Sequence, residues 1–534
     1  MKQTILSVLT TLLIGFFIFY IYLPPINITS IAFWLFVIVL LFVYGIASLI
    51  FSKRDYKIIN MSGVNINVPK SAYVVFTSVL IIVAGILLIN FVCSPLFNAK
   101  SYSKRITIDE SNNFLEDVKE VDFKSIPLLD RDSSQKLGDR VMGQMNEYVS
   151  QYYVSDQYTQ INFNNEILRV TPLEYDGFIK WITNRKNGIN AYITVNSVNG
   201  EAKLTKLDKG MRYMPSALFN EKLTRKLRFL YPTTIFGESK FEIDNEGTPY
   251  WITPTYKYTG INMKTKVTGV VILNPVTGDA KKYNINEIPS WVDNAYNASL
   301  IIEQVDNWGT YKNGFLNSIF GQKNVVNTTE GYNYLALNDD IYLYTGITSV
   351  LSDESNLGFI LSNMRTGKTT YYPVAGAEEY SAMASAEGQV QQMGYKSTFP
   401  LLINLNNRPT YLVSLKDAAG LVKMYGFVDV VDYQKVVVTD AAKGIEISAQ
   451  NYLSSFGTEV GNNLLEKSSI IVKKITSVTI DGNTYFYIID ENNKKYKVSI
   501  KTSDSLPYVT TGDKLEIGYV NKNKNEIIEI TKVY

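Results

Sequence analysis

Residues 161–172 read INFNNEILRVTP and residues 241–254 read FEIDNEGTPYWITP, so both segments place an Asn/Asp turn between two apolar runs. Residues 403–414 (INLNNRPTYLVS) give a third match, and residues 334–344 (YLALNDDIYLY) give a weaker fourth one. Asn and Asp tolerate the positive φ angles that tight hairpin turns require. The sequence therefore predicts one strand, turn and strand pattern about four times between residues 161 and 438.

A second tight turn follows each of these segments. It closes an apolar strand at residues 196–200 (NSVNG), 274–278 (NPVTG) and 363–367 (NMRTG), and it lacks the glycine at residues 429–432 (DVVD). Helical patterns precede the strands at residues 133–148, 216–230, 290–308 and 377–393. We therefore expect an α+β chain in which each copy is a helix followed by a small antiparallel sheet.

The first 94 residues differ in kind from the rest. Residues 5–23, 31–51 and 72–94 are three runs without a charged residue, each close to the roughly 20 residues that cross a bilayer. A secretory signal is the alternative for the first run, but no small-residue cleavage site follows it. Because the loop at 52–71 is basic and the loop at 24–30 is uncharged, we expect a cytoplasmic N-terminus and an extracytoplasmic chain from about residue 95.

Composition narrows the function classes. Without the five basic and one acidic residues of the first 94, the chain holds 47 basic and 49 acidic residues, which gives no electrostatic footprint for nucleic acid. Histidine is absent, so His-containing triads, zinc sites and haem ligation are excluded. Cys93 is the only cysteine, which excludes an intrachain disulfide and fits a bacterial surface protein. The absence of charge inside the spans disfavours transport.

At 534 residues the chain is expected to contain several domains. The tail has about five short runs of strand-forming residues with sharp turns, which predicts a small barrel of the OB-like or SH3-like kind. The expected division is a transmembrane anchor (1–94), a juxtamembrane connector (95–131), four repeat units (132–210, 211–288, 289–374 and 375–460) and the barrel (466–534).

A helix laid on a small curled sheet resembles the cystatin-like units of the PepSY family. In that family a strand with an Asp/Asn-x-x-Thr-Gly-Asp/Glu turn closes the unit, and residues 273–283 (LNPVTGDAKKY) are the closest match here. Residues 196–201 and 363–368 match more loosely, and the resemblance covers residues 132–440. It implies a binding or regulatory module, sometimes suggested to restrain proteases, and it brings no catalytic residues.

Two short motifs imitate known catalytic sequences. Gly367-Lys368-Thr369 resembles the end of a phosphate-binding loop, but Ser362 stands where that loop requires another glycine. The same turn recurs with Asp279 in place of the lysine, so a hairpin turn is the better interpretation. Ser101 and Lys104 form a Ser-x-x-Lys pair, but the partner motifs of penicillin-recognising enzymes do not follow, which favours chance.

Acidic residues are the remaining candidates for catalysis. Asp339 and Asp340 form the densest group with Asp353 and Glu354, and Glu378 and Glu379 open a predicted helix. No Asp-x-Asp-x-Asp-Gly loop accompanies them, and such placements are ordinary in turns and first helical turns. Two carboxylates suffice for glycoside hydrolysis, so this chemistry stays open as an alternative. We predict no catalytic, cofactor-binding or metal-binding residues and no cofactor.

Aromatic residues are the preferred candidates for ligand contact. They can pave a groove for a glycan or peptide, although alternating tyrosines in strands pack against a sheet more often. The candidates are Tyr332, Tyr334, Tyr342, Tyr344, Tyr371, Tyr372, Trp291 and Trp308.

The main hypothesis is a non-enzymatic, membrane-anchored bacterial cell-surface protein. Its PepSY-like array would bind a protein, peptide or cell-envelope polymer through exposed sheet edges and aromatic faces, and the barrel would add a second contact. An extracytoplasmic, carboxylate-dependent cell-wall hydrolase is one alternative. An assembly subunit whose three helices bind another membrane protein is the other.

Overall fold

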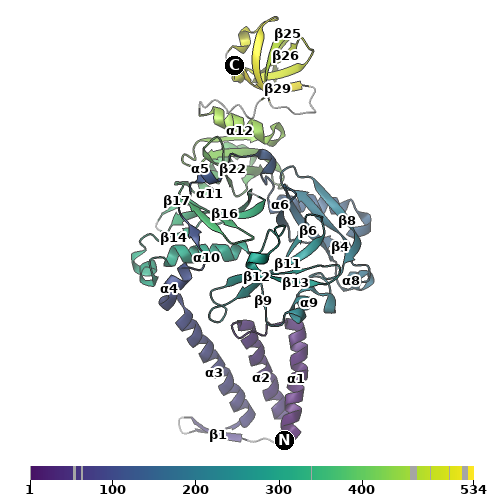
Figure 1. Cartoon of the computed structure of the whole chain (residues 1–534), viewed down its shortest axis with the longest axis vertical. Helices are drawn as coiled ribbons and strands as arrows, with labels where there is room; N and C mark the ends of the chain where they lie inside the picture. Colours follow the sequence, from purple (N-terminus) through teal and green to yellow (C-terminus); the bar gives the residue numbers. More distant parts are fainter. Residues whose placement is uncertain are drawn as a thin grey trace. The chain divides into compact units, whose positions relative to one another are not determined.

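The computed structural model describes residues 2–51, 56–61, 64–337, 339–350, 352–456, 466–480, 483–503, 505–519 and 527–533 (Figure 1). The chain forms two compact units. Unit 1 comprises Met1–Phe114 and Lys124–Glu378, and unit 2 comprises Leu115–Phe123 and Glu379–Tyr534. The architecture is mixed α+β, with three apolar helices at the N-terminus and several antiparallel sheets.

Three long helices begin unit 1. They are α1 (Lys2–Tyr22), α2 (Ile31–Phe51) and α3 (Lys70–Cys93), and each is long and apolar enough to cross a membrane. A hairpin of β1 (Tyr56–Met61) and β2 (Val64–Pro69) joins α2 to α3. The prediction of three apolar helices is therefore confirmed.

The first sheet has the order β4-β6-β7-β8, with β5 also paired to β6. Helices α6 (Arg131–Gly143) and α7 (Asn146–Val149) precede it, and the Asp130 carboxylate caps α6 by accepting from the Ser133 amide. Between β6 and β7 the chain forms α8 (Phe178–Asn184). The strands are β4 (Tyr152–Val154), β5 (Thr159–Phe163), β6 (Glu166–Tyr175), β7 (Ile189–Asn196) and β8 (Ala202–Met211).

The second sheet repeats this order as β10-β11-β12-β13, with β9 paired to β11. The short helices η2 (Phe219–Glu221) and α9 (Leu223–Leu230) precede it, and η3 (Ile285–Glu287) follows it. The strands are β9 (Ile235–Phe236), β10 (Lys240–Ile243), β11 (Pro249–Lys257), β12 (Lys266–Leu273) and β13 (Ala280–Asn284).

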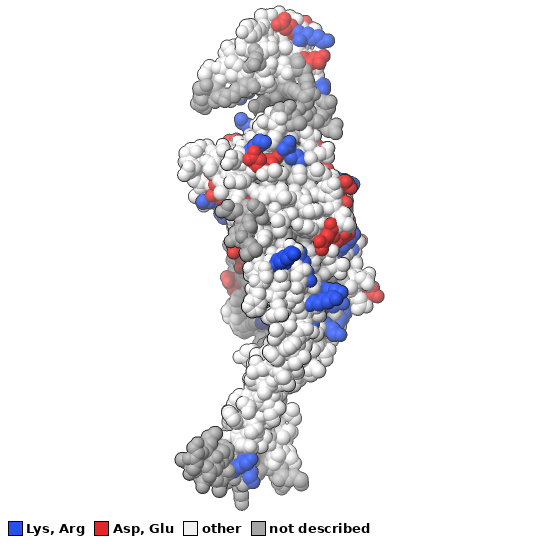
Figure 2. All heavy atoms as spheres, turned by 90° about the vertical axis from the view of Figure 1, so that its left-hand side faces the viewer, with Lys and Arg blue, Asp and Glu red and all other residues white. Residues whose placement is uncertain are grey.

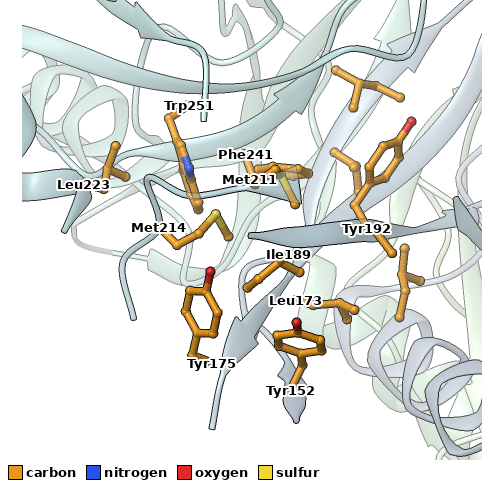
Figure 3. Packing of buried hydrophobic residues seen from close by; sticks show 14 of the residues in the cluster. Tyr152, Leu173, Tyr175, Ile189, Tyr192, Met211, Met214, Leu223, Phe241 and Trp251 are labelled. Atoms are coloured by element: carbon orange, nitrogen blue, oxygen red, sulfur yellow. The ribbon is translucent and has the colours of Figure 1, made fainter. Parts of the chain in front are cut away.

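The first two sheets share one hydrophobic core. Phe241 and Trp251 from the second sheet lie with Ile189 and Met211 from the first (Figure 3). The Phe241 and Trp251 rings are 5.3 Å apart, and all four side chains are fully buried. Burial of aromatic area on this scale fixes the two sheets to each other.

The third sheet follows α10 (Ala298–Tyr311) and the π-helical turn η4 (Asn317–Gly321). Its order is β14-β16-β17-β18-β3, with β15 paired to β16 and β19 to β17. The strands are β14 (Val326–Thr328), β15 (Asn333–Leu337), β16 (Asp340–Ser349), β17 (Ser352–Asn363), β18 (Thr369–Tyr372), β19 (Gly376–Ala377) and β3 (Ile108–Asp109).

The segment expected to be a connector, residues 95–131, is largely built into the two units. It supplies α4 (Pro95–Ser103), which packs on α10, and β3, which runs parallel to β18. After α5 (Phe114–Asp117), Glu120 forms an isolated β-bridge with Asn404 of unit 2. The side-chain amide of Asn404 also donates to the Val118 carbonyl at 2.8 Å. The reason is that the open edges of β18 and β21 offer backbone partners that a polar segment can use.

Unit 2 begins with a fourth sheet of order β20-β22-β23-β24, with β21 paired to β22. Helix α11 (Glu379–Gln389) and η5 (Gln391–Met393) precede it, and η6 (Ala441–Lys443) and α12 (Ile445–Ser454) follow it. The strands are β20 (Lys396–Ser397), β21 (Leu401–Asn404), β22 (Pro409–Lys416), β23 (Val422–Asp429) and β24 (Val436–Asp440).

The tail of unit 2 is a closed barrel of order β25-β26-β27-β29-β28. The long strand β25 pairs with both β26 and β28, and β27 runs parallel to β29. Val472, Ile488, Val498, Leu506 and Ile517 fill its interior. The strands are β25 (Glu466–Ile480), β26 (Asn483–Asp490), β27 (Lys495–Ser499), β28 (Lys514–Tyr519) and β29 (Ile527–Val533), with η7 (Ile500–Thr502) and η8 (Leu506–Tyr508) after β27.

One turn geometry recurs in all four sheets. The side-chain oxygen of Asn196, Asn274, Asn363 or Asp429 accepts from the two backbone amides that lie two and three residues later, at 2.8–3.1 Å. In the first hairpins, Asn164 and Asn165 have positive φ, as do Asn406 and Asn407. The predicted turns are confirmed at these positions, whereas Asn338 of the fourth match lies outside the described residues.

Candidate functional site

The aromatic residues predicted to contact a ligand do not share one surface. Tyr344 and Tyr372 are buried, and their rings pack on Phe359 at 5.7 Å and Phe114 at 5.8 Å. A ring that is buried in this way belongs to the packing of the third sheet and is not accessible to a polymer.

Tyr334, Tyr371 and Trp308 pack against one core cluster of the third sheet, whereas Trp291 packs against another cluster. Tyr332 is 44% exposed and contacts Tyr334 edge to face, with 5.6 Å between ring centroids. Tyr371 packs on Trp308 at 6.2 Å, and Trp291 packs on Tyr250 at 5.1 Å in a different core cluster. Tyr342 is half-buried on β16. Only Tyr332 among the candidates is a largely exposed ring.

The phosphate-loop look-alike is a hairpin turn between β17 and β18. Asn363 Oδ1 accepts from the Arg365 amide at 3.0 Å and the Thr366 amide at 2.8 Å, and the Gly367 amide donates to the Asn363 carbonyl. These amides are already used, so they cannot cradle a phosphate. The hairpin interpretation of Gly367-Lys368-Thr369 is confirmed. In the Ser-x-x-Lys motif, Ser101 Oγ accepts from Lys264.

The acidic candidates are engaged in local structure. Asp340 accepts from the Arg365 guanidinium at 2.6–2.9 Å and from Asn363, and Asp339 occupies a turn position with φ +68°. The side chains of Asp353 and Glu354 lie outside the described part, and Glu379 is buried beside Glu378 at the start of α11. Within the described ranges no three Asp, Glu or Cys side chains group in a way that could hold a metal.

Sequence reasoning missed two carboxyl groups that meet inside unit 1. Glu242 on β10 is fully buried, and Asp293, from the segment before α10, is 2% exposed. The Glu242 carboxylate accepts from the Asp293 amide at 2.9 Å and the Asn294 amide at 3.0 Å. Burial raises the pKa of Glu242 to about 7, and burial together with the Glu242 charge raises the pKa of Asp293 well above its ordinary value.

This pair connects the first and second sheets, and we call it the carboxyl junction. Asp293 Oδ2 accepts from the Asn162 amide on β5 at 2.7 Å, and the Asn294 side chain donates to the Gln160 carbonyl at 3.0 Å. The junction therefore joins the first sheet, the second sheet and the segment that leads to the third. Its burial gives it no access to a polymeric substrate, so its chemistry is structural and dependent on pH.

The C-terminal end of α1 forms a second polar arrangement. Arg225 on α9 donates to the Tyr20 carbonyl at 3.0 Å, and its guanidinium lies 3.9 Å from the Tyr20 ring centroid. Arg228 donates to the Leu23 carbonyl at 2.9 Å and to the Thr234 carbonyl at 2.6 Å. The last carbonyls of a helix have no intrahelical partner and carry partial negative charge. The two arginines therefore cap the C-terminus of α1 by donating to these carbonyls.

The end of α3 and the loop between α1 and α2 contact loops of the second sheet. Asn90 near the end of α3 donates to the Ile261 carbonyl at 3.1 Å and accepts from the Ile261 amide at 2.9 Å. The loop between α1 and α2 binds the second sheet as well, because Ile26 donates to the Pro232 carbonyl and Asn262 donates to the Thr29 carbonyl. We call this set of contacts the collar, and it links the ends of α1 and α3 and the loop before α2 to α9 and to loops that flank strands of the second sheet.

The collar contacts could not be predicted from the sequence, because their partners are about 170 to 235 residues apart along the chain. The one available signal is the pair Arg225 and Arg228, two cations on one helical face beside apolar residues. A scan of the chain against protein-family models finds no match, and a search of curated proteins also finds none.

Proposed function

We propose that this protein is a membrane-anchored, non-enzymatic cell-surface protein of bacterial type whose extracytoplasmic part binds a protein, peptide or anionic envelope polymer. In this proposal α1 to α3 cross the membrane, the N-terminus is cytoplasmic, and the sheets and barrel lie outside. The three apolar helices, with the basic hairpin segment between α2 and α3, support this arrangement.

Two lysine-bearing sheet edges carry the binding proposal. Among the described strands, β8 and β13 each end their sheet without a further partner. Their exposed lysines are Lys203, Lys206 and Lys209 on β8, and Lys281 and Lys282 on β13. Lysines on an edge discourage pairing with apolar strands while favouring an extended acidic partner, which can add itself as a strand.

The barrel supports a second contact. Tyr485 and Tyr487 alternate on β26, and Lys497 of β27 lies 4.2 Å from the Tyr485 ring centroid. We propose that the barrel is OB-like. In OB folds the second and third strands form a ligand-binding face, and here those strands, β26 and β27, carry aromatic rings and a cation of the kind that stack on sugars. The parallel pairing of β27 with β29 in a five-stranded barrel favours this over an SH3-like fold.

We also propose that the four sheets are copies of one PepSY-like unit. Their common strand order and common Asx turn support an origin from one repeated element.

Binding to isolated envelope polymer tests the function. The full-length chain in detergent is mixed with purified cell-wall sacculi, and both the bound protein and any released soluble fragments are measured. The triple variant Lys203→Gln, Lys206→Gln, Lys209→Gln is expected to bind roughly fivefold more weakly, because each exposed charge contributes a fraction of a kcal/mol.

The matched control removes three exposed lysines elsewhere, Lys423→Gln, Lys435→Gln and Lys443→Gln, and is expected to bind as the native chain does. Equal binding by both triple variants would refute the edge proposal. Fragment release that disappears on Asp339→Asn or Glu379→Gln would replace it with the hydrolase alternative.

The collar favours a second candidate, an assembly subunit of a membrane complex. Its hydrogen bonds join the span ends to the second sheet, so a partner bound to the helices would also bias the sheet. Crosslinking in native membranes distinguishes this role, because it predicts capture of one integral membrane protein that is lost when α1 to α3 are replaced by foreign spans.

A further inference from the structure

We propose that unit 1 stands on the outer leaflet through two apolar surfaces, one beside α1 and one beside α3, with lysines that contact anionic lipid headgroups. The first foot consists of Phe178, Ile179, Ile182, Phe219, Phe229 and Leu230. The second foot consists of Leu96, Phe97, Leu316, Ile319 and Phe320. This inference rests on the proposed membrane anchoring and adds a lipid-binding surface to it.

The first foot projects from α8, η2 and α9. Phe178, Ile179 and Ile182 are 51%, 64% and 47% exposed along the one short helix α8. Phe219 on η2 is 56% exposed and has a φ of +49°, an unusual conformation for a bulky side chain. Exposing so many large apolar groups next to one another to water is unfavourable, and such patches typically mark an interaction surface.

Contacts connect the first foot to the end of α1. The Tyr20 hydroxyl donates to Asn220 Oδ1 at 3.1 Å, directly beside Phe219. The Phe219 ring lies 5.6 Å from Trp181, which lies 6.1 Å from Phe178. Phe229 packs on both Phe19 and Tyr20 of α1. The foot is therefore continuous with the apolar surface of a candidate membrane span.

The second foot lies beside the end of α3. Phe320, Leu316 and Ile319 are 81%, 67% and 50% exposed in the turn after α10. Tyr311, near that turn, contacts the Tyr102 ring at 6.0 Å, and Tyr102 donates to the Cys93 carbonyl at the end of α3.

Helix α4 belongs to the same surface. Its residues Leu96 and Phe97 are 44% and 61% exposed, and Phe97 packs on Phe91 of α3 at 5.2 Å. In Figure 1, α9 lies above the upper end of α1 with α8 to its right, and α4 continues upward from α3 toward α10. Both feet thus flank the spans at the ends where the collar holds them.

Cations accompany both feet. Lys180 and Lys186 belong to or follow α8, and Lys312 and Lys323 flank the turn of the second foot. Lys312 lies 4.4 Å from the Trp308 ring centroid, so an indole and an ammonium share that edge. Figure 2 shows a mostly uncoloured stem of apolar helices and blue side chains on the part of unit 1 next to it. This combination of apolar, indole and basic groups is typical of a membrane interface.

The lipid bilayer is the favoured partner of the two feet, because each foot contacts the end of one candidate membrane span. A soluble partner would have no reason to match two separate surfaces on either side of the helices, whereas a lipid surface meets both at once. Exposed lysines near an anionic leaflet add an attraction that depends on lipid charge.

Site-specific labelling of the full-length chain tests the inference. Cys93→Ser removes the one native cysteine, and an environment-sensitive fluorophore is then placed on Ile179→Cys or Phe320→Cys. In nanodiscs with phosphatidylglycerol, both labels are expected to be quenched at least twofold more by lipid-borne bromine than a control label on Val431→Cys. Val431 is 74% exposed in unit 2 and serves as the matched apolar position.

Labels at Ile179→Cys and Phe320→Cys that respond to aqueous iodide and ignore brominated lipid would overturn the inference. Labels shielded from both quenchers would also overturn it, by indicating a protein occupant. Resistance of the chain to carbonate extraction is scored separately, so a failure of anchoring is distinguished from a failure of the feet. With Lys180→Gln and Lys186→Gln, the quenching of the Ile179→Cys label in anionic discs is expected to fall to its value in phosphatidylcholine discs.

Discussion

Glu242 and Asp293 bring two carboxyl groups into the interior of unit 1, where a charge is poorly solvated. Burial raises the pKa of both, although Glu242 accepts two backbone amides and Asp293 accepts one. A carboxyl group with a raised folded-state pKa contributes stability below its unfolded pKa and loses that contribution as pH rises through the folded value. The junction therefore makes unit 1 less stable in mild alkali than in mild acid.

Asp293→Asn is expected to flatten this dependence. The amide keeps an oxygen for the Asn162 N–H but removes the charge that opposes Glu242. The unfolding free energy of the variant relative to the native chain is expected to rise by about 1–3 kcal/mol between pH 5 and pH 8, since each unit of pKa shift corresponds to about 1.4 kcal/mol. Chemical denaturation of the full-length chain at the two pH values measures it.

Asp208→Asn is the matched control, because it makes the same chemical change on the exposed face of β8. It is expected to leave the pH dependence as it is in the native chain. A native chain whose stability does not fall between pH 5 and pH 8 would contradict the assignment of raised pKa values to the junction.

Turn residues and buried acids differ in how far sequence can predict them. Asn196 and its three counterparts act on amides two and three residues away, so the short motif contains the whole interaction. Glu242 alternates with apolar neighbours in the same way that a solvent-facing strand residue does. Its burial depends on Asp293 and Asn294, 51 and 52 residues later, which no local pattern records.

At the scale of elements, α9 is shorter than its sequence pattern predicted. The apolar spacing predicted a helix over residues 216–230, whereas α9 begins at Leu223 and residues 219–221 form the separate turn η2. The helix begins later because a tertiary contact holds the preceding turn in a non-helical conformation. Phe219 adopts positive φ, and its carbonyl accepts from Arg225 at 2.6 Å, which joins the turn to the helix that completes α1.

Arg228→Ala is expected to loosen the joint between α1 and α9. Arg228 is 6% exposed and donates to several carbonyls, and its loss leaves those acceptors without a charged donor. We expect a loss of about 2–3 kcal/mol in unfolding free energy. Hydrogen exchange is expected to speed up in residues 23–30 and 231–234, while the chain stays in the membrane fraction.

Lys226→Ala on the same helix provides the comparison, with an expected change within about 0.5 kcal/mol. Arg228→Lys is expected to recover only part of the loss, because an ammonium cannot reach carbonyls in several directions as a guanidinium does. Equal exchange rates in the Arg228→Ala and native chains would show that the joint does not depend on this residue.

At the scale of the whole molecule, the barrel is complete within its own sequence. Its strands close on one another, and among the described residues its core cluster is drawn from residues 470–533. A domain with a closed sheet and a separate core unfolds as its own cooperative unit.

Deletion of residues 466–534 is therefore expected to leave the thermal unfolding of unit 1 unchanged, with a midpoint shift below about 2 °C. Differential scanning calorimetry of the full-length and truncated chains measures this, and the truncated chain is expected to lose one transition. A large fall in the remaining midpoint would mean that the barrel stabilises unit 1.

Features that depend on neighbouring residues follow directly from the amino-acid sequence. The three apolar helices follow from uninterrupted hydrophobic runs, and the recurring turns follow from Asn or Asp at fixed offsets. The strand-rich tail predicted a small barrel for the same reason, because period-two patterns and turn residues act over a few positions.

Which distant residues contact one another depends on the packing of the sheets. This packing buried Tyr344 and Tyr372, which the sequence offered as ligand contacts, and it joined Glu242 to Asp293 and Arg228 to Leu23 across long stretches of chain. It also left Phe178, Phe219 and Phe320 exposed beside the helix ends. Burial and long-range hydrogen bonds depend on how sheets pack on one another, and that packing is a property of the whole unit that a local pattern does not encode.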